Sequence, residues 1–269
     1  MRIIVIGGGI AGLSVAAKLA PHAQVTVLES ERALSYHASG RSAAMFLLGY
    51  GNTVVQALNA ASAAELSALG VLAPKGILMA ARAQDTDAFE ADVAHMGIPE
   101  ISVTEAQKVL PILNSNVVRR AAYDADATTL DTDAMLQSYL KAARAAGANI
   151  RTQSPVTAIE PGWRVRTGDA WLDADVLVNA AGAWCDEVAA MAGISTLGFT
   201  ACRRAVAQMP LPTEQDADHW PFVIAAGERW YAKVIAGKWM VSPAEEDAVP
   251  PMDAYVDDMA LAEGLARYE

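Results

Sequence analysis

Residues 2–29 read RIIVIGGGIAGLSVAAKLAPHAQVTVLE, and this stretch decides the fold. An apolar start that carries several glycines is compatible with a secretory signal peptide, a membrane span, or the first turn of a nucleotide-binding domain. Arg2 and the small residues near Ala20 imitate a signal peptide, whereas Lys18 interrupts the roughly 20 apolar residues that a span needs. Neither of these two interpretations explains the glycines.

A nucleotide-binding turn accounts for each part of the stretch. Residues 2–6 have the β-branched character of a buried parallel strand. Gly7–Gly12 fits G-x-G-x-x-G, in which the glycines allow a tight turn, a close approach to pyrophosphate and close packing of helix on strand. A small-residue helix over 13–20 would offer its N-terminus to phosphate. A second strand over 24–28 ends at Glu29, where a carboxylate accepts hydrogen bonds from a ribose.

These elements together predict a Rossmann-type dinucleotide-binding domain. The carboxylate of Glu29 disfavours a 2′-phosphate and therefore NADP, which leaves NAD and FAD. The next stretch, SYHASGRSAA over 35–44, is small and polar, with Arg41 flanked by hydroxyls. Such a loop can lie along a long anionic cofactor or be an ordinary surface loop, and its composition does not decide between them.

Composition excludes several classes of partner. The chain has 269 residues, a formal net charge of −11 and 53% hydrophobic residues. A charge of this sign argues against nucleic acid and anionic membrane surfaces as partners. Cys185 and Cys202 lack metal-site spacing, so we expect free thiols, no metal site and a cytoplasmic location.

Hydrophobic periodicity and turn residues predict further elements along the chain. Helices are expected over 54–69, 85–96, from a capping box at Thr104–Gln107 towards Leu110, over 132–146 with Asp131 as the cap, and from Asp253 towards Tyr268. Short strands at 149–151, 156–159, 163–166 and Trp171 are expected to form a meander, with Tyr123–Asp124 in a loop and 176–178 as a buried strand. Strand-like runs over 199–209, 221–224, 230–233 and 238–241 predict an antiparallel sheet.

Six separated stretches occur in the order found in one flavoprotein family. They are VIGGGIAGLS (5–14), VLES (27–30), YHASGRSAA (36–44), DTDAMLQSYLKAARAAGA (131–148), VLVNAAGAWCDEVAAMAG (176–193) and GERWYAKV (227–234). With them the chain resembles the DAO-type FAD-dependent D-amino-acid dehydrogenases and glycine oxidases, and in particular the D-arginine dehydrogenase-like members.

The resemblance implies an α/β fold with two discontinuous domains. One is a Rossmann-type FAD-binding domain with a parallel sheet, expected over 1–72 and 122–193. The other is an α+β substrate domain with an antiparallel sheet, expected over 73–121 and 194–269. The implied activity is that of an oxidoreductase that oxidises the Cα–N bond of a D-amino acid, or a related amine acid, to an imino acid by hydride transfer to flavin N5.

The resemblance also implies the residues of the site. The implied cofactor-binding residues are Gly7, Gly9, Ile10, Ala11, Gly12, Glu29, Ser30, Ser39, Gly40, Arg41, Ser42, Val156, Ala180, Ala181, Gly182 and Trp184. On the substrate side, Tyr231 matches a tyrosine that bonds the substrate carboxylate, Arg204 matches a substrate contact, and Tyr50 matches a mobile-loop tyrosine. Each of these three residues also has a purely structural interpretation. Tyr231 could be a tyrosine of the sheet core, Arg204 a solvated charge at the sheet edge, and Tyr50 an ordinary packed aromatic residue. No histidine is assigned to catalysis.

Three departures from the family pattern modify these expectations. Ile77 stands where the D-arginine-oxidising members have an acid, and Met45 stands where an active-site histidine is found. Because isoleucine cannot pair with a buried cation, a neutral or apolar D-amino acid is predicted in preference to D-arginine. The third departure is length, since family members continue beyond position 269; a C-terminally truncated substrate domain is therefore expected.

Other functions and partners stay open at this point. The chain could be an FAD-binding subunit or fragment that is inactive without a partner chain, or an NAD-dependent dehydrogenase. The expected partners are a small-molecule amine or D-amino acid and either a completing subunit or further copies of the chain, with no nucleic acid and no membrane span.

Overall fold

The computed structural model describes residues 1–212, 214 and 216–268 and divides into two compact units. Unit 1 comprises Met1–Ser42, Asp131–Ala201 and Ala248–Asp253, and unit 2 comprises Ala43–Leu130, Cys202–Asp247 and Ala254–Glu269. Positions 213, 215 and 269 of the expected substrate domain lie outside the described residues. Residues 43–72, which were expected in the FAD-binding domain, belong to unit 2. The assignment of a function to each domain stays a prediction.

A four-stranded parallel sheet forms the centre of unit 1. Its order is β13 (Val176–Asn179), β1 (Arg2–Ile6), β2 (Gln24–Leu28) and β9 (Asn149–Arg151). All three strand pairs are parallel, as the expected α/β class requires. Ile3–Ile6 are buried, because a central parallel strand is covered on both faces. The strand at 149–151 therefore belongs to this sheet, and its expected place in the meander is wrong.

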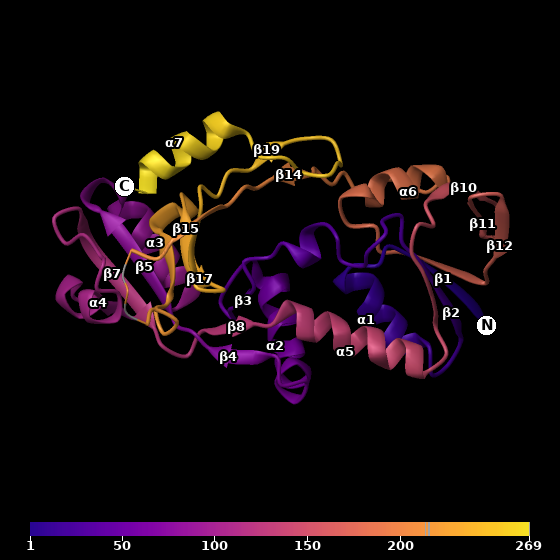
Figure 1. Cartoon of the computed structure of the whole chain (residues 1–269), viewed down its shortest axis with the longest axis horizontal. Coiled ribbons are helices and arrows are strands. Elements are labelled where there is room, and N and C mark those ends of the chain that lie inside the picture. Colours follow the sequence, from indigo (N-terminus) through magenta and orange to yellow (C-terminus); the bar gives the residue numbers. More distant parts are fainter. Residues whose placement is uncertain (213, 215, 269) are drawn as a thin grey trace. The chain divides into compact units, whose positions relative to one another are not determined.

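Two helices pack side by side in unit 1, α1 (Ile10–Leu19) and α5 (Thr132–Ala145) (Figure 1). Leu13 of α1 shares a buried cluster with Leu136 and Leu140 of α5. The backbone N–H of Ala134 donates to Asp131 Oδ1 at 2.9 Å, which confirms the predicted N-cap. The amphipathic pattern of this segment thus placed its apolar face correctly.

The rest of unit 1 contains a small meander and a short helix. The meander consists of β10 (Val156–Glu160), β11 (Arg164–Thr167) and β12 (Ala170–Asp173), paired antiparallel. After β13 come η3 (Gly182–Trp184) and α6 (Cys185–Met191). Val176 is 37% exposed, so the expectation of a fully buried strand at 176–178 is wrong; β13 lies at the end of the sheet order and is covered less than β1.

A seven-stranded sheet forms the core of unit 2. Its order is β15 (Ala207–Pro210), β18 (Lys238–Ser242), β17 (Tyr231–Ile235), β16 (Phe222–Ala225), β5 (Ile77–Arg82), β7 (Val118–Asp124) and β6 (Glu100–Ile101). Every pair is antiparallel except β16 with β5. Alternate residues of β5 serve different faces: Leu78 and Ala80 belong to one buried cluster, and Ile77 and Met79 to another.

Helices and short strands complete unit 2. They are β3 (Met45–Phe46), α2 (Thr53–Ala68), β4 (Leu72–Pro74), α3 (Thr86–Met96), α4 (Val103–Val109), β8 (Thr128–Leu130), β14 (Cys202–Arg203) and α7 (Asp258–Tyr268). Phe89 of α3 is buried in the cluster of Ile77, whereas Ala106 of α4 and Leu265 of α7 lie in the cluster of Leu78. The sheet therefore has a buried cluster on each face.

Several local expectations for unit 2 are wrong. The capping box is made by Ser102 and Glu105 rather than by Thr104 and Gln107: Glu105 N donates to Ser102 Oγ at 3.2 Å, and Ser102 N donates to Glu105 Oε2 at 2.9 Å. Tyr123–Asp124 was expected in a loop but lies in β7. The expected strand over 199–209 is interrupted, since only 202–203 and 207–209 are strand. The last helix begins at Asp258 instead of Asp253.

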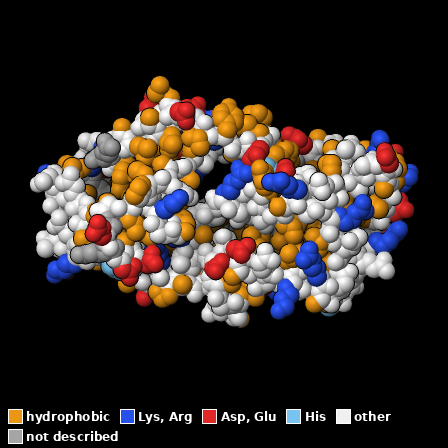
Figure 2. All heavy atoms as spheres, viewed as in Figure 1, with side chains coloured by type: hydrophobic (Ala, Val, Ile, Leu, Met, Phe, Trp, Pro, Cys, Tyr) orange, Lys and Arg blue, Asp and Glu red, His pale blue; other side chains and the backbone are white. Residues whose placement is uncertain are grey.

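Three observations concern the helices, the surface and the cysteines. In the part of the chain that is described, every helix is too short or too polar to cross a bilayer. Hydrophobic side chains gather around α7 in Figure 2, where Tyr255, Val256 and Met259 are exposed. Within the described residues, neither Cys185 nor Cys202 forms a disulfide.

Candidate cofactor site and substrate-side residues

The glycine turn between β1 and α1 is built as the spacing predicts. Gly7 has a φ of 108°, and a Cβ there would collide with the carbonyl of Ala180 on the neighbouring strand connection. A Cβ on Gly12 would collide with the carbonyl of Gly7, so the third glycine lets α1 start close to β1. At Gly9 a Cβ would meet Ser39 Oγ at 2.9 Å. The absence of a side chain at Gly9 therefore lets the loop at 35–39 approach the backbone of this turn.

Glu29 lies at the end of β2 with its carboxylate on the glycine turn. Its Oε2 accepts from Gly8 N at 2.7 Å, and its Oε1 accepts from Glu31 N at 2.9 Å. The side chain is only 8% exposed. These backbone N–H groups fix the carboxylate in one orientation, as a hydrogen-bond acceptor for a ribose requires.

A cavity of about 600 Å³ opens over the turn and Glu29. It lies entirely within unit 1 and is lined by 6–11, 28–30, 35–39, 154–156, 179–185 and part of α6. The C-terminal ends of β1, β2 and β13 all reach it, and this edge of a parallel sheet is where ligands of doubly wound folds bind. The N-terminus of α1 also faces it, without a side-chain cap at Gly9.

The cavity brings together most of the residues named from the sequence. Its lining includes Gly7, Gly9, Ile10, Ala11, Glu29, Ser30, Ser39, Val156, Ala180, Ala181, Gly182 and Trp184. Gly12 supports the turn from behind. Gly40, Arg41 and Ser42 are outside the lining, and Arg41 pairs with Asp253 at 2.8 Å. Their expected contact with a cofactor stays a prediction.

An aromatic cluster at the cavity was missed at the sequence level. The ring of His37 lies 4.6 Å from that of Trp184 and 5.0 Å from that of Tyr36, and its Nε2 is 3.2 Å from Glu31 Oε1. No role was assigned to His37 from the sequence, and the structure places this residue on the lining of the cavity. Its position two residues before Ser39, in a stretch already assigned to the cofactor, was the available signal.

The three substrate-side residues all lie in unit 2. Tyr231 begins β17, and its ring packs on Phe222 with centroids 5.4 Å apart. Tyr50 follows β3, and its hydroxyl donates to Glu228 Oε2 at 3.3 Å; burial, followed by the carboxylate of Glu228, raises the pKa of Tyr50. Within the described residues, no hydrogen bond joins Tyr231 to Tyr50.

Arg203 ends β14, and Arg204 lies directly after the strand; the two arginines have opposite environments. Arg203 is the buried member at 8% exposure and pairs with Asp247 at 3.0 Å. Arg204 points to the more open side, where its Nη2 donates to Glu246 Oε1 at 2.6 Å. The guanidinium also acts electrostatically on Tyr50, since it opposes the rise in that pKa.

Lys233 is a buried cation that sequence reasoning did not single out. Its Nζ donates to Thr129 Oγ1 at 2.6 Å and to the carbonyls of Ala43 and Ala44 at 3.0 and 3.4 Å. Burial, together with the charge of Lys75, lowers the pKa of Lys233 to about 8. The side chain thus joins β17 to β8 and to the two residues before β3.

The sequence of the chain is similar to those of known flavoproteins. Residues 2–268 match the family model described as DAO, FAD dependent oxidoreductase. The chain belongs to this family. Dimethylglycine dehydrogenase from Mus musculus is 25% identical over 209 residues, which is 71% of this chain and 24% of that protein. The chain therefore spans about a quarter of that curated relative.

Solved structures show the same fold at low identity. L-proline dehydrogenase from P.horikoshii is 20% identical with a TM-score of 0.81, and the match covers 99% of this chain and 75% of the other. L-alpha-glycerophosphate oxidase from Mycoplasma pneumoniae, with FAD bound, is 16% identical with a TM-score of 0.81, over 98% of this chain and 77% of the other. Since one acts on an amino acid and the other on glycerophosphate, the fold alone does not select an amine substrate.

Family membership decides between the two dinucleotides that the glycine turn left open, and the cofactor is FAD. The residues fit it. A cradle that a Cβ would fill at Gly9, an acceptor carboxylate at Glu29 and a helix N-terminus with glycine as its N-cap residue lie around one cavity. The nicotinamide-dependent alternative is thereby set aside.

Proposed function

We propose that the chain carries the FAD-dependent oxidation of the Cα–N bond of a D-amino acid, or a related amine acid, to an imino acid. The observation that supports this most is the cavity over Gly7–Gly12 and Glu29 in a chain of this family. When bound, FAD would supply the redox chemistry as the hydride acceptor. The names of the matched dehydrogenases, for dimethylglycine and L-proline, favour an amine acid over an alcohol.

In this proposal unit 1 holds the cofactor through backbone and one carboxylate. The pyrophosphate would lie at the N-terminus of α1, the ribose would donate to Glu29, and the backbone at Val156 would contact adenine. Ile10 N donates to Ser39 Oγ at 3.0 Å, so this hydroxyl holds the loop against the start of the helix. Gly40, Arg41 and Ser42 would follow the pyrophosphate towards the flavin.

In the same proposal unit 2 orients the substrate. Tyr231 would donate to the carboxylate, Arg204 would contact the substrate, and Tyr50 would cover it as part of a mobile loop. Orientation of the Cα–H and a carboxylate clamp supply most of the catalysis in amine oxidation, because the flavin performs the redox step. Ile77 is 1% exposed and offers no charge for a cationic side chain, so a neutral or apolar substrate is proposed over D-arginine.

Anaerobic flavin reduction tests this function. FAD-loaded protein is mixed with D-leucine, D-methionine or D-arginine without oxygen, and the flavin absorbance is followed. We expect D-leucine and D-methionine to bleach the flavin faster than D-arginine, and Tyr231→Phe to slow the bleaching without releasing FAD. Faster reduction by D-arginine would overturn the proposed side-chain preference, and absence of reduction by every amine acid would overturn the activity.

A second candidate is a cofactor-binding polypeptide that works with another chain. The matched solved chains are longer, since the match spans 75% and 77% of them. Stoichiometric FAD binding with no bleaching, restored by a partner polypeptide, would select this candidate. For either candidate function, a cytoplasmic location is proposed.

A further inference from the structure

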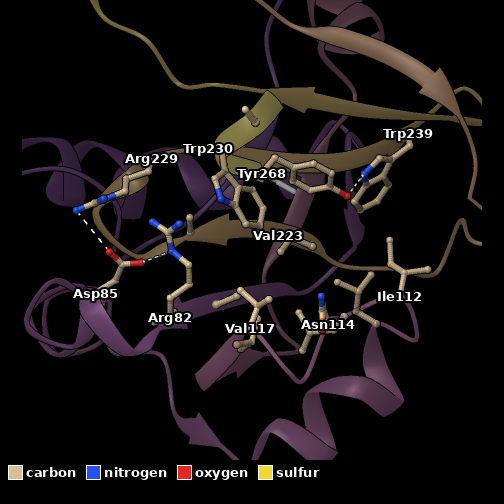
Figure 3. A pocket seen from close by; sticks show the side chains of 17 residues that line it. Arg82, Asp85, Ile112, Asn114, Val117, Val223, Arg229, Trp230, Trp239 and Tyr268 are labelled. Atoms are coloured by element: carbon tan, nitrogen blue, oxygen red, sulfur yellow. Dashed lines mark hydrogen bonds and ion pairs between the residues drawn. The ribbon is translucent and has the colours of Figure 1, made fainter. Parts of the chain in front are cut away.

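A second cavity, of about 250 Å³, lies within unit 2 and is separate from the cofactor site (Figure 3). It is bounded by β5, by β16, by the segment 110–118 and by α7. Ala80, Val223 and Trp239 on its lining belong to the buried cluster of Leu78. The cavity is therefore on the opposite face of the sheet from Ile77, and the proposed activity assigns it no role.

Most of its wall is apolar and held rigidly. Trp230 meets Tyr268 edge to face, with ring centroids 5.1 Å apart. Trp239 Nε1 donates to Tyr268 Oη at 2.8 Å, so the indole N–H is satisfied and the rest of that ring presents an apolar surface. Val223, Ile112 and Val117 add further apolar surface to the lining that Figure 3 shows.

One end of the cavity is charged and contains an incompletely bonded carboxylate. Asp85 is 6% exposed, and its Oδ2 accepts from Arg82 Nε at 2.9 Å. Its Oδ1 lies 3.5 Å from Arg229 Nη2, which is an ion pair, but accepts no hydrogen bond from any described residue. A buried carboxylate oxygen without a donor costs free energy, so this oxygen favours a ligand that donates to it.

The same end also offers unused donors. The hydrogen bond of Arg82 within the described chain uses only Nε, and Figure 3 shows its two terminal nitrogens on the side of the guanidinium away from Asp85. A guanidinium presents its N–H groups in a planar fork that matches a carboxylate. An acceptor for an ammonium and a donor pair for a carboxylate are thus adjacent.

We propose that this cavity binds the zwitterion of a free α-amino acid with an apolar side chain. Its ammonium donates to Asp85 Oδ1, its carboxylate accepts from Arg82, and its side chain packs between Val223 and Trp230. A simple anion would be repelled by Asp85, a simple cation by the two arginines, and a hydrocarbon would leave Oδ1 unbonded. An apolar cavity of about 150 Å³ takes benzene, so 250 Å³ accommodates a side chain of leucine or phenylalanine size together with the head group.

Isothermal titration of the FAD-loaded full chain with L-leucine and L-phenylalanine tests this. The L-enantiomers are used because the proposed oxidation acts on D-amino acids. We expect saturable binding of one ligand per chain that Arg82→Leu or Asp85→Asn weakens by at least about tenfold. The matched control is Arg119→Leu, because Arg119 is exposed, bonds the carbonyl of Ser115 and is not on the lining; this variant should bind as the wild type does.

A second variant keeps the test decisive where a charge substitution disturbs folding. Val117 is 40% exposed on the lining, so Val117→Trp adds a large side chain without opening a buried gap. Loss of binding in Val117→Trp, with Tyr231→Phe still binding, supports the proposal and separates this cavity from the substrate site. Absence of saturable binding to the wild type at millimolar ligand, or equal affinity in Val117→Trp, would overturn it.

Discussion

At the scale of single residues, Glu29 connects the glycine turn to recognition of the cofactor. Its two carboxylate oxygens accept from Gly8 N and Glu31 N, and the side chain is nearly buried. A carboxylate held by two backbone donors keeps a fixed direction for the remaining lone pairs. The residue therefore has a local structural role and the proposed role of ribose acceptor at once.

Replacement of Glu29 measures the second role. Glu29→Gln keeps the size and one acceptor oxygen but removes the charge, and we expect FAD to bind about 10- to 100-fold more weakly, because a hydrogen bond to a charged group contributes roughly 1.5–3 kcal/mol. Fluorescence quenching of FAD gives the affinity. Glu160→Gln, at the exposed end of β10, is the control, and an unchanged affinity in Glu29→Gln would contradict the assigned role.

Lys233 predicts a pH dependence of stability. Burial lowers its pKa to about 8, whereas a lysine in the unfolded chain titrates near 10.4. Between these values the unfolded state binds more protons, so the free energy of unfolding rises with pH, by an amount on the order of 1–3 kcal/mol. In Lys233→Met, the free energy of unfolding should rise less with pH, because the contribution of this amine is removed.

Urea denaturation at pH 8 and pH 10 provides the measurement for Lys233. The rise between the two pH values is compared among the wild type, Lys233→Met and Lys238→Met, an exposed lysine on β18. Other groups contribute equally to all three proteins, so the comparison isolates Lys233. An identical rise in Lys233→Met and the wild type would show that the amine titrates as it does in water.

At the scale of elements, the cap of α5 is the clearest link between sequence and stability. Asp131 accepts from Ala134 N, and α5 buries Leu136 and Leu140 against α1. Asp131→Ala should lower the free energy of unfolding by about 1 kcal/mol, the usual contribution of an N-cap. Asp169→Ala, in the exposed turn between β11 and β12, should stay within about 0.5 kcal/mol of the wild type in the same chemical denaturation. Equal stabilities of the two variants would contradict the capping role.

Elements with strong local signals could be predicted, and those set by distant contacts could not. β1, α1 and β2 follow from β-branched runs and the glycine spacing, and Asp131 from its position before an amphipathic run. The strand at 149–151 was placed in the wrong sheet, because its partner β2 lies over 100 residues earlier and local periodicity carries no pairing information. The capping box was assigned to Thr104 instead of Ser102, because each of these residues stands three positions before a Glu or Gln and the spacing alone does not distinguish them.

At the scale of the whole molecule, the cofactor site was accessible from sequence because its parts share one motif, and the remaining features were not. Val156 could be named only through the resemblance, since it is far from the glycine turn along the chain. Lys233 and the cavity at Asp85 escaped entirely. Each depends on a partner that lies far away along the chain, Thr129 for Lys233 and Arg229 for Asp85, and no spacing rule connects such partners.

The central claim is that the turn at Gly7–Gly12 and Glu29 hold FAD, and a titration of the folded chain with FAD tests it most directly. The account predicts saturable binding of one FAD per chain, a rise in melting temperature with FAD concentration, and loss of both in Gly9→Val, where a side chain would meet Ser39 Oγ. Ala125→Val, on an exposed turn of unit 2, should bind as the wild type does. Folded protein that shows no binding at saturating FAD, or a Gly9→Val variant that binds with unchanged affinity, would contradict the account.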